Sequence, residues 1–134
     1  MPDEFATLVI SNHVLEHTEC PLETLRSLYP KISKNGRIVF VVPHQKPTES
    51  YDEQDVNQHL YTWNPLTLGN LFKAAGYVNI QVDAIRHMWP PFYLHIHRML
   101  GEKSFHLMSR GYAVLRGNYQ LRVVAEKHSD FVDR

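Results

Sequence analysis

Residues 5–43 read FATLVISNHVLEHTECPLETLRSLYPKISKNGRIVFVVP, and this stretch decides the fold. It opens with an apolar, β-branched run at 5–11 and closes with another at 37–43. Apolar runs of this length without a helical period are typical of strands buried on both faces, as in parallel sheets. We therefore expect two buried strands, one at each end of the stretch.

A helix is predicted between the two strands. Pro21 suits a first helical turn, and the leucines that follow recur at a spacing that gives the helix one apolar face: Leu22, Leu25 and Leu28. We expect the helix to end within the SKNG stretch at 33–36. Two strands joined by a helix over about 30 residues form a βαβ unit, which implies a parallel sheet covered by helices.

A polar segment follows at 44–62, and the alternation of helices and strands continues after it. Open α/β sheets bind ligands at the carboxyl ends of their strands, which is where this segment begins. Asn64 and Pro65 are then expected to start a helix that Gly76 ends.

Two further strands are expected, at 77–85 and 119–127, the first of them half exposed or near an edge. We expect a single domain over 1–134, in which 86–118 forms an inserted lid segment before the last strand. The spacing of its aromatic residues, Trp89 among them, is more typical of a packed core, and the alternatives are a lid over an apolar acceptor or a dimer surface.

The composition is that of an ordinary globular domain. Of 134 residues, 43% are hydrophobic and 21% are charged, and the net charge is zero. No apolar run approaches the roughly 20 residues of a membrane span, and the start lacks a basic leader, so we expect a cytoplasmic protein. The cations of 86–122 are widely spread, which indicates a solvated face. We expect neither nucleic acid nor membrane as a partner.

The order of these motifs resembles the carboxyl-terminal half of the class I S-adenosylmethionine-dependent methyltransferases. The resemblance rests on SNHVLEH after the first strand, on KNGRIVFVVP, and on HLYTWNPLTLGNLFKAAGY before the third strand. It implies a partial Rossmann-like sheet whose strands correspond to the fourth to seventh of that family, covering 5–84 closely and the last strand more loosely. Thr7 and Asn35 depart from the pattern, where the family commonly has aspartate and glycine.

The resemblance implies methyl transfer from S-adenosylmethionine to a small-molecule oxygen, nitrogen or carbon. It places Ser11, Asn12 and His13 at the cofactor's amino-acid end and Glu16 near the acceptor. His17 is one candidate for the base that accepts the acceptor's proton, because histidine exchanges protons near neutral pH.

The polar segment supplies the other candidates. His59 is the second candidate base, and the resemblance implies that His44, Tyr61 and Trp63 contact the acceptor. An alternative is that Tyr61 and Trp63 only pack as a hydrophobic lead-in to the Pro65 helix.

The chain lacks the family's cofactor cradle. Its six glycines include no pair with the GxG spacing of the loop that approaches the cofactor. We therefore expect weak or absent cofactor binding by this chain alone, which would make it a truncated methyltransferase that is inactive by itself.

The resemblance also predicts a partner for strand 5–11. In the parent sheet the first strand lies beside the fourth, so strand 5–11 would be left with an open edge, and open edges recruit partners. We expect a homodimer, or an amino-terminal methyltransferase half, to pair with strand 5–11. The alternative function is a non-catalytic α/β assembly module that docks a partner through this strand.

The string HVLEH at 13–17 also matches HxxEH, in which two histidines one helical turn apart bind zinc. That motif lies within a long helix and needs a third ligand, whereas here a strand precedes it and Pro21 follows it closely. We therefore expect no metal, and a second alternative is that the histidines are merely solvated while Val14 and Leu15 pack.

Overall fold

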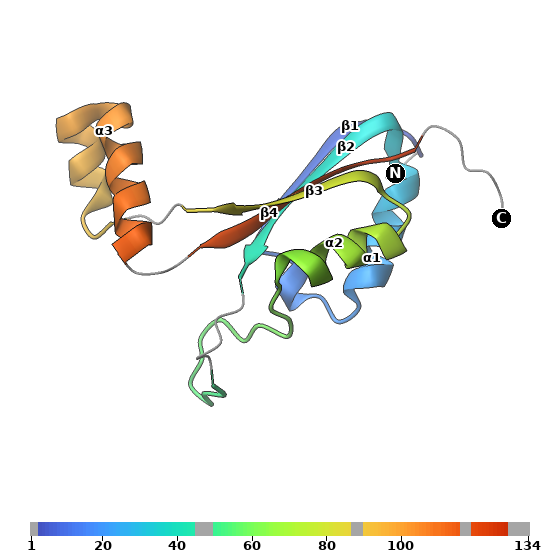
Figure 1. The fold of residues 1–134 in the computed structure, drawn as a ribbon, viewed down its shortest axis with the longest axis horizontal. Helices are drawn as coiled ribbons and strands as arrows, with labels where there is room; N and C mark the ends of the chain where they lie inside the picture. The colour runs from blue at the N-terminus through green and yellow to red at the C-terminus, as the bar shows by residue number, and fades with distance from the viewer. Residues whose placement is uncertain (1–2, 45–49, 87–89, 116–118, 129–134) are drawn as a thin grey trace. The chain divides into compact units, whose positions relative to one another are not determined.

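The computed structural model describes residues 3–44, 50–86, 90–115 and 119–128 (Figure 1). The chain divides into two compact units, one of Met1–Asp83 with Leu121–Arg134 and one of Ala84–Gln120. The first unit holds most of a four-stranded sheet and two α-helices, and the second holds one long, kinked helix. None of the described helices combines the length and the hydropathy that a membrane span requires.

The two strands expected at the ends of the opening stretch are present as β1 (Ala6–Asn12) and β2 (Ile32–Pro43). They pair in parallel, from Leu8 opposite Arg37 to Asn12 opposite Val41. Between them lie the short 3-10 helix η1 (Leu15–His17), the helix α1 (Pro21–Leu28) and a second 3-10 turn, η2 (Tyr29–Lys31). The predicted βαβ unit is confirmed.

The predicted end of the first helix is wrong. α1 stops at Leu28 and passes directly into η2, and the SKNG stretch at 33–36 belongs to β2. Pro30 explains the early stop, because proline lacks the N–H that would continue the α-helical ladder and its ring crowds the preceding turn.

The SKNG stretch forms a bulge in β2. Ala6 lies opposite Ile32 and Leu8 opposite Arg37, so the pairing shifts register between these two positions. Asn35 takes a left-handed conformation with φ of 58°, and the Ser33 hydroxyl donates to the Ala6 carbonyl over 3.1 Å. At Gly36 a Cβ atom would lie 2.6 Å from Ile32 Cγ2 and 2.8 Å from the Ser33 carbonyl oxygen. Only glycine fits this crossing of the backbone.

The strand order is β1-β2-β4-β3, with β3 at Val78–Ile85 and β4 at Gln120–Glu126. β4 runs against its neighbours: Lys127, after its end, donates its N–H to Gly36 near the start of β2, and Glu126 meets Asn79 at the start of β3. The Glu126 carboxylate also accepts from Arg37, and these two donors hold the pKa of Glu126 below its usual range. β1 and β3 are the edge strands, as expected for both.

One face of the sheet carries α1 and α2 (Pro65–Ala74), which lie on the same side of it (Figure 1). Asn64 starts α2 with a reciprocal capping box to Thr67, and Gly76 ends it at φ of 97°, both as predicted. The Tyr77 hydroxyl then donates to the Leu25 carbonyl over 3.0 Å, and burial raises the pKa of Tyr77. The core beneath the helices includes Ile38, Phe40, Val42, Leu68, Phe72, Leu121 and Val123.

No described helix of this unit covers the opposite face of the sheet. Along β2, residues alternate between buried and half-buried, with Val39 and Val41 on the less buried side. Ile10, opposite Val39 on β1, is 68% exposed, and Leu8 is 51% exposed. The expectation that 5–11 is buried on both faces is therefore wrong in this chain, because β1 has an open edge and an uncovered face.

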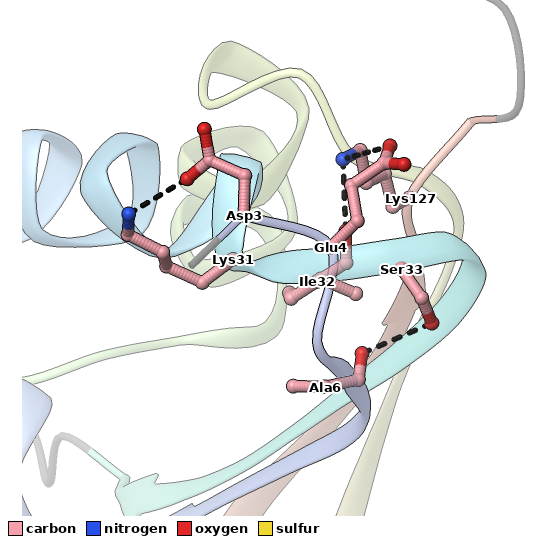
Figure 2. Close-up of polar contacts among 7 residues, drawn as sticks. All are labelled: Asp3, Glu4, Ala6, Lys31, Ile32, Ser33 and Lys127. Carbon is pink, nitrogen blue, oxygen red and sulfur yellow. Dashed lines mark hydrogen bonds and ion pairs between the residues drawn. The ribbon is translucent and has the colours of Figure 1, made fainter. Parts of the chain in front are cut away.

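Polar contacts tie the segment before β1 to residues beside the start of β2 and the end of β4 (Figure 2). This end of the sheet lies opposite the carboxyl ends of β1 and β2. Lys31 Nζ lies 2.7 Å from Asp3 Oδ1, and this contact lowers the pKa of Asp3. Lys127 Nζ donates both to Glu4 Oε1 (3.2 Å) and to the Ile32 carbonyl (2.8 Å). These contacts hold the start of β1 against β2 and the end of β4.

The second unit contains α3 (Tyr93–Leu115), which Gly101 interrupts with φ of 73°. Phe105 and Ala113 are buried within the unit, and the His97 and Phe105 rings meet edge to face at 5.5 Å. This helix falls inside the predicted lid segment 86–118, of which 87–89 and 116–118 lie outside the described residues. A lid function for the segment stays a prediction.

Gly36→Ala is expected to lower the free energy of unfolding by about 1–3 kcal/mol, because the added methyl group overlaps the Ser33 backbone and the Ile32 side chain. Gly69→Ala in α2 is the matched control: its Cβ would make an ordinary 3.6 Å contact with Val82, and alanine favours a helix by roughly 1 kcal/mol. Urea unfolding measures both. Equal stability of the two variants would contradict the bulge assignment.

Candidate functional site

The carboxyl ends of β1 and β2 lie side by side because the strands are parallel. Ser11 pairs with Phe40, Asn12 pairs with Val41, and the His13 N–H then donates to the Val41 carbonyl over 2.9 Å. His13 has φ of 52°, a left-handed conformation that non-glycine residues seldom adopt and that clusters at functional sites. The three residues expected at the cofactor's amino-acid end thus occupy the edge of the sheet where α/β proteins bind ligands.

The next residues form η1, a single 3-10 turn that ends before α1 begins at Pro21. Leu15 and Glu16 are both 0% exposed, whereas His17 is exposed. Thr18 closes the turn with its N–H and its hydroxyl, which donate to the Leu15 carbonyl at 3.3 and 2.9 Å. A carboxylate is therefore buried where the chain leaves the sheet.

The polar segment folds back onto η1. The N–H groups of Leu60 and Tyr61 both donate to the Glu16 carbonyl, at 2.9 and 3.2 Å, and the Tyr61 hydroxyl donates to the Glu19 carbonyl at 2.9 Å. These three bonds fix His59 beside η1.

Glu16, His13, His17 and His59 form one cluster, which we call the Glu16 cluster. His13 Nδ1 lies 3.1 Å from Glu16 Oε1, and His59 Nε2 lies 4.0 Å from the same oxygen. The rings of His17 and His59 meet edge to face with centroids 4.9 Å apart. The fold thus brings together both candidate bases, the candidate substrate contact Glu16, and one candidate cofactor residue.

The other three predicted site residues are spread more widely. His44 is half-buried and forms an isolated parallel bridge with Trp63, which is only 6% exposed. Tyr61 stacks on Trp63 with centroids 5.7 Å apart. This is the arrangement expected if the two rings pack as a lead-in to α2, and acceptor contacts by His44, Tyr61 and Trp63 stay a prediction.

A cavity of about 650 Å³ opens beside the cluster. Its lining includes His44, His59 and three carboxylates, those of Asp52, Glu53 and Asp55. Sequence reasoning did not single out these carboxylates, although three acids within four positions of a polar segment offered a signal. Their side chains give the cavity a negative rim.

Comparison with known proteins places this arrangement in context. A model of the methyltransferase domain family matches residues 1–82. No curated protein matches the chain.

Solved structures match its fold at low sequence identity. The Haemonchus contortus phosphoethanolamine N-methyltransferase 2 bound to phosphomonomethylethanolamine and S-adenosylhomocysteine is 15% identical, with a TM-score of 0.60 over 97% of this chain and 35% of its own. The methyltransferase in complex with the Haloferax volcanii Trm112 activator is 16% identical, with a TM-score of 0.67 over 98% and 57%. An Archaeoglobus fulgidus S-adenosylmethionine-dependent methyltransferase is 20% identical, with a TM-score of 0.60 over 95% and 62%.

The chain therefore spans between about a third and three fifths of the length of these structures. The expected fold class, a partial Rossmann-like methyltransferase sheet with flanking helices, is confirmed by the strand order and by these neighbours. Because the family model matches more than half of its residues, this chain belongs to the methyltransferase domain family.

Proposed function

We propose that this chain is the carboxyl-terminal half of an S-adenosylmethionine-dependent methyltransferase for a small-molecule acceptor, and that it is inactive alone. The observation that supports the proposal is the convergence of Ser11, Asn12 and the Glu16 cluster at the carboxyl ends of β1 and β2, in a chain of this family. S-adenosylmethionine would supply an activated methyl group. The chain's own residues would align the acceptor and remove its proton.

The residues present fit one border of a cofactor site. Ser11 is half-buried and Asn12 exposed at the end of β1, so their polar groups are available to an amino-acid moiety. The sequence contains no GxG spacing that would let a backbone loop approach the rest of the cofactor. The chain alone thus offers a partial site.

His59 is the better placed of the two candidate bases. Its Nε2 lies 4.0 Å from the buried Glu16 carboxylate, which would stabilise the imidazolium formed when His59 takes a proton. The edge-to-face contact with His17 restricts the orientation of the ring. His17 is more exposed and is therefore the less favoured candidate for the base.

The negative rim of the cavity favours an amine acceptor. Asp52, Glu53 and Asp55 would attract a protonated amine toward His59, which also lines the cavity. One structural neighbour holds an ethanolamine-type amine. Among the oxygen, nitrogen and carbon acceptors that the family uses, nitrogen is therefore our proposal.

The edge of β1 is the proposed docking site for the missing half. His13 donates its N–H to β2, and because amides alternate along a strand, the Ile10 N–H, three residues earlier, points to the open side. Leu8 and Ile10 add exposed apolar surface next to this edge. A methyltransferase-type first strand with its helices would pair with the edge and cover the open face.

The isolated chain is expected to bind S-adenosylmethionine no more tightly than roughly millimolar, because most cofactor contacts depend on a glycine-rich loop that it lacks. Isothermal titration calorimetry measures this. Micromolar binding would show that the described residues suffice and would overturn the proposed division of the site.

Methyl transfer is expected when the chain is co-expressed with an amino-terminal methyltransferase half that carries a glycine-rich loop. With labelled S-adenosylmethionine and a panel of amines, phenols and carbon acids, His59→Ala should slow transfer by about 100-fold or more, the effect of losing a general base. His128→Ala is the control, because His128 is exposed beyond the end of β4. Complex formation without any transfer would favour the assembly module.

Ile10→Pro is expected to abolish that complex, because proline removes the N–H on the open edge. Ile10→Ala keeps this N–H while losing the same side chain, so it should retain most of the binding. Analytical ultracentrifugation reports the association, and circular dichroism checks that both variants fold. Undiminished assembly of the proline variant would exclude pairing through β1.

A further inference from the structure

Glu16 presents an electrostatic problem that the proposed function leaves unsolved. Its side chain is 0% exposed, and neither carboxylate oxygen has a hydrogen-bond partner among the described residues. His13 Nδ1 lies 3.1 Å from Oε1, but this contact does not form a hydrogen bond. An ionised carboxylate buried in this way destabilises the folded state unless a cation compensates it.

Two imidazole rings stand beside this carboxylate. Glu16, His17 and His59 each offer one ligand atom, and these atoms all lie within 4.8 Å of one another. Ligand atoms around a tetrahedral zinc ion lie roughly 3.4 Å apart, given bonds of about 2.0–2.1 Å, so the three groups need to close by up to about 1.4 Å. His17 is exposed and the His59 side chain is 24% exposed, so both can rotate inward while Glu16 stays fixed.

We propose that Glu16, His17 and His59 bind a divalent zinc ion, with a fourth position open to solvent. Two imidazoles and one carboxylate are a ligand set that zinc prefers, whereas magnesium and calcium favour oxygen ligands alone. The exposure of His17 leaves room for a water molecule or a substrate atom on the ion. His13 remains outside the ligand set, with its Nδ1 3.1 Å from Oε1 of the carboxylate.

The site is held together by the backbone. The Glu16 carbonyl accepts from the N–H groups of Leu60 and Tyr61. The Tyr61 hydroxyl donates to the Glu19 carbonyl and is not one of the proposed ligands. The backbone of the two ligands on η1 and that of the one ligand on the polar segment are thus fixed relative to each other before any ion arrives. Such preorganisation is what a metal site requires of its scaffold.

This arrangement differs from the zinc motif that the sequence suggests. In HxxEH the two histidines would be ligands and the glutamate a base, but His13 lies at the left-handed turn before η1 and contacts Glu16. The glutamate becomes a ligand, and the third ligand that the sequence did not reveal is His59. The expectation of no metal rested on the strand before the motif and on Pro21 after it, as well as on the missing third ligand.

The proposal goes beyond methyl transfer and does not depend on it. A His59 nitrogen that binds zinc cannot also accept a proton from the acceptor. With zinc bound, the ion rather than His59 would activate the acceptor, by polarising one of its atoms. Metal binding is measurable on the chain without cofactor or acceptor. Its outcome is therefore separate from that of the methyl-transfer experiment.

The test is titration of the tag-free, chelator-treated full chain with zinc chloride, followed by calorimetry and by competition with a chromophoric chelator. We expect one zinc per chain with micromolar or tighter affinity, and a higher melting temperature with zinc than without. His17→Ala and His59→Ala should each weaken binding about 10-fold or more. His95→Ala and His128→Ala, which alter exposed histidines outside the cluster, should leave it unchanged.

Glu16→Gln provides a second readout. It should lose zinc affinity while the apo protein keeps or gains thermal stability, because the buried charge is removed. If this variant does not fold, the affinities of His17→Ala and His59→Ala for zinc still test the proposal. Zinc binding that survives in the double variant His17→Ala/His59→Ala would overturn the proposal. So would a loss of affinity in His128→Ala as large as in the ligand variants, or a stoichiometry well below one zinc per chain.

Discussion

Parallel strands joined by a helix must end at the same edge of their sheet, and β1 and β2 meet this constraint from Leu8 opposite Arg37 to Asn12 opposite Val41. Everything at the candidate site follows from this pairing. It places His13 where its N–H reaches Val41, and it lets the chain turn into η1 directly above the sheet edge. The polar segment leaves β2 at that same edge, and its hydrogen bonds to the Glu16 and Glu19 carbonyls bring His59 alongside.

Within the described sheet β1 lies at an edge, whereas β2 has a strand on each side. On its other side β2 is flanked by β4, and Glu126 links β4 to Arg37 and to Asn79 across both neighbouring strands. On the β1 side no described strand follows. The exposed side chains of Leu8 and Ile10 adjoin this edge, so an open strand edge and apolar surface coincide there, which supports the docking proposed for β1.

The burial of Glu16 connects the two proposals. A fully buried carboxylate without a hydrogen bond is a cost that a folded protein retains where the charge has a use. It can stabilise an imidazolium during proton transfer, or it can bind a cation together with His17 and His59. Both uses require the same local structure: η1 fixed at the end of β1, and the Glu16 carbonyl occupied by the polar segment.

The sequence by itself determined the elements and their order, because strand and helix periodicity, Pro21, the Asn64 cap and Gly76 are local signals. It also indicated the open edge, through the glycine-rich loop that the chain lacks. It could not give the early end of α1 or the bulge, since the register of β2 depends on its fit to β1 and on the space around Gly36. Only the tertiary structure decided that Glu16 is buried and that His59 joins His17, because residues far apart in the chain meet only through the backbone bonds between η1 and the polar segment.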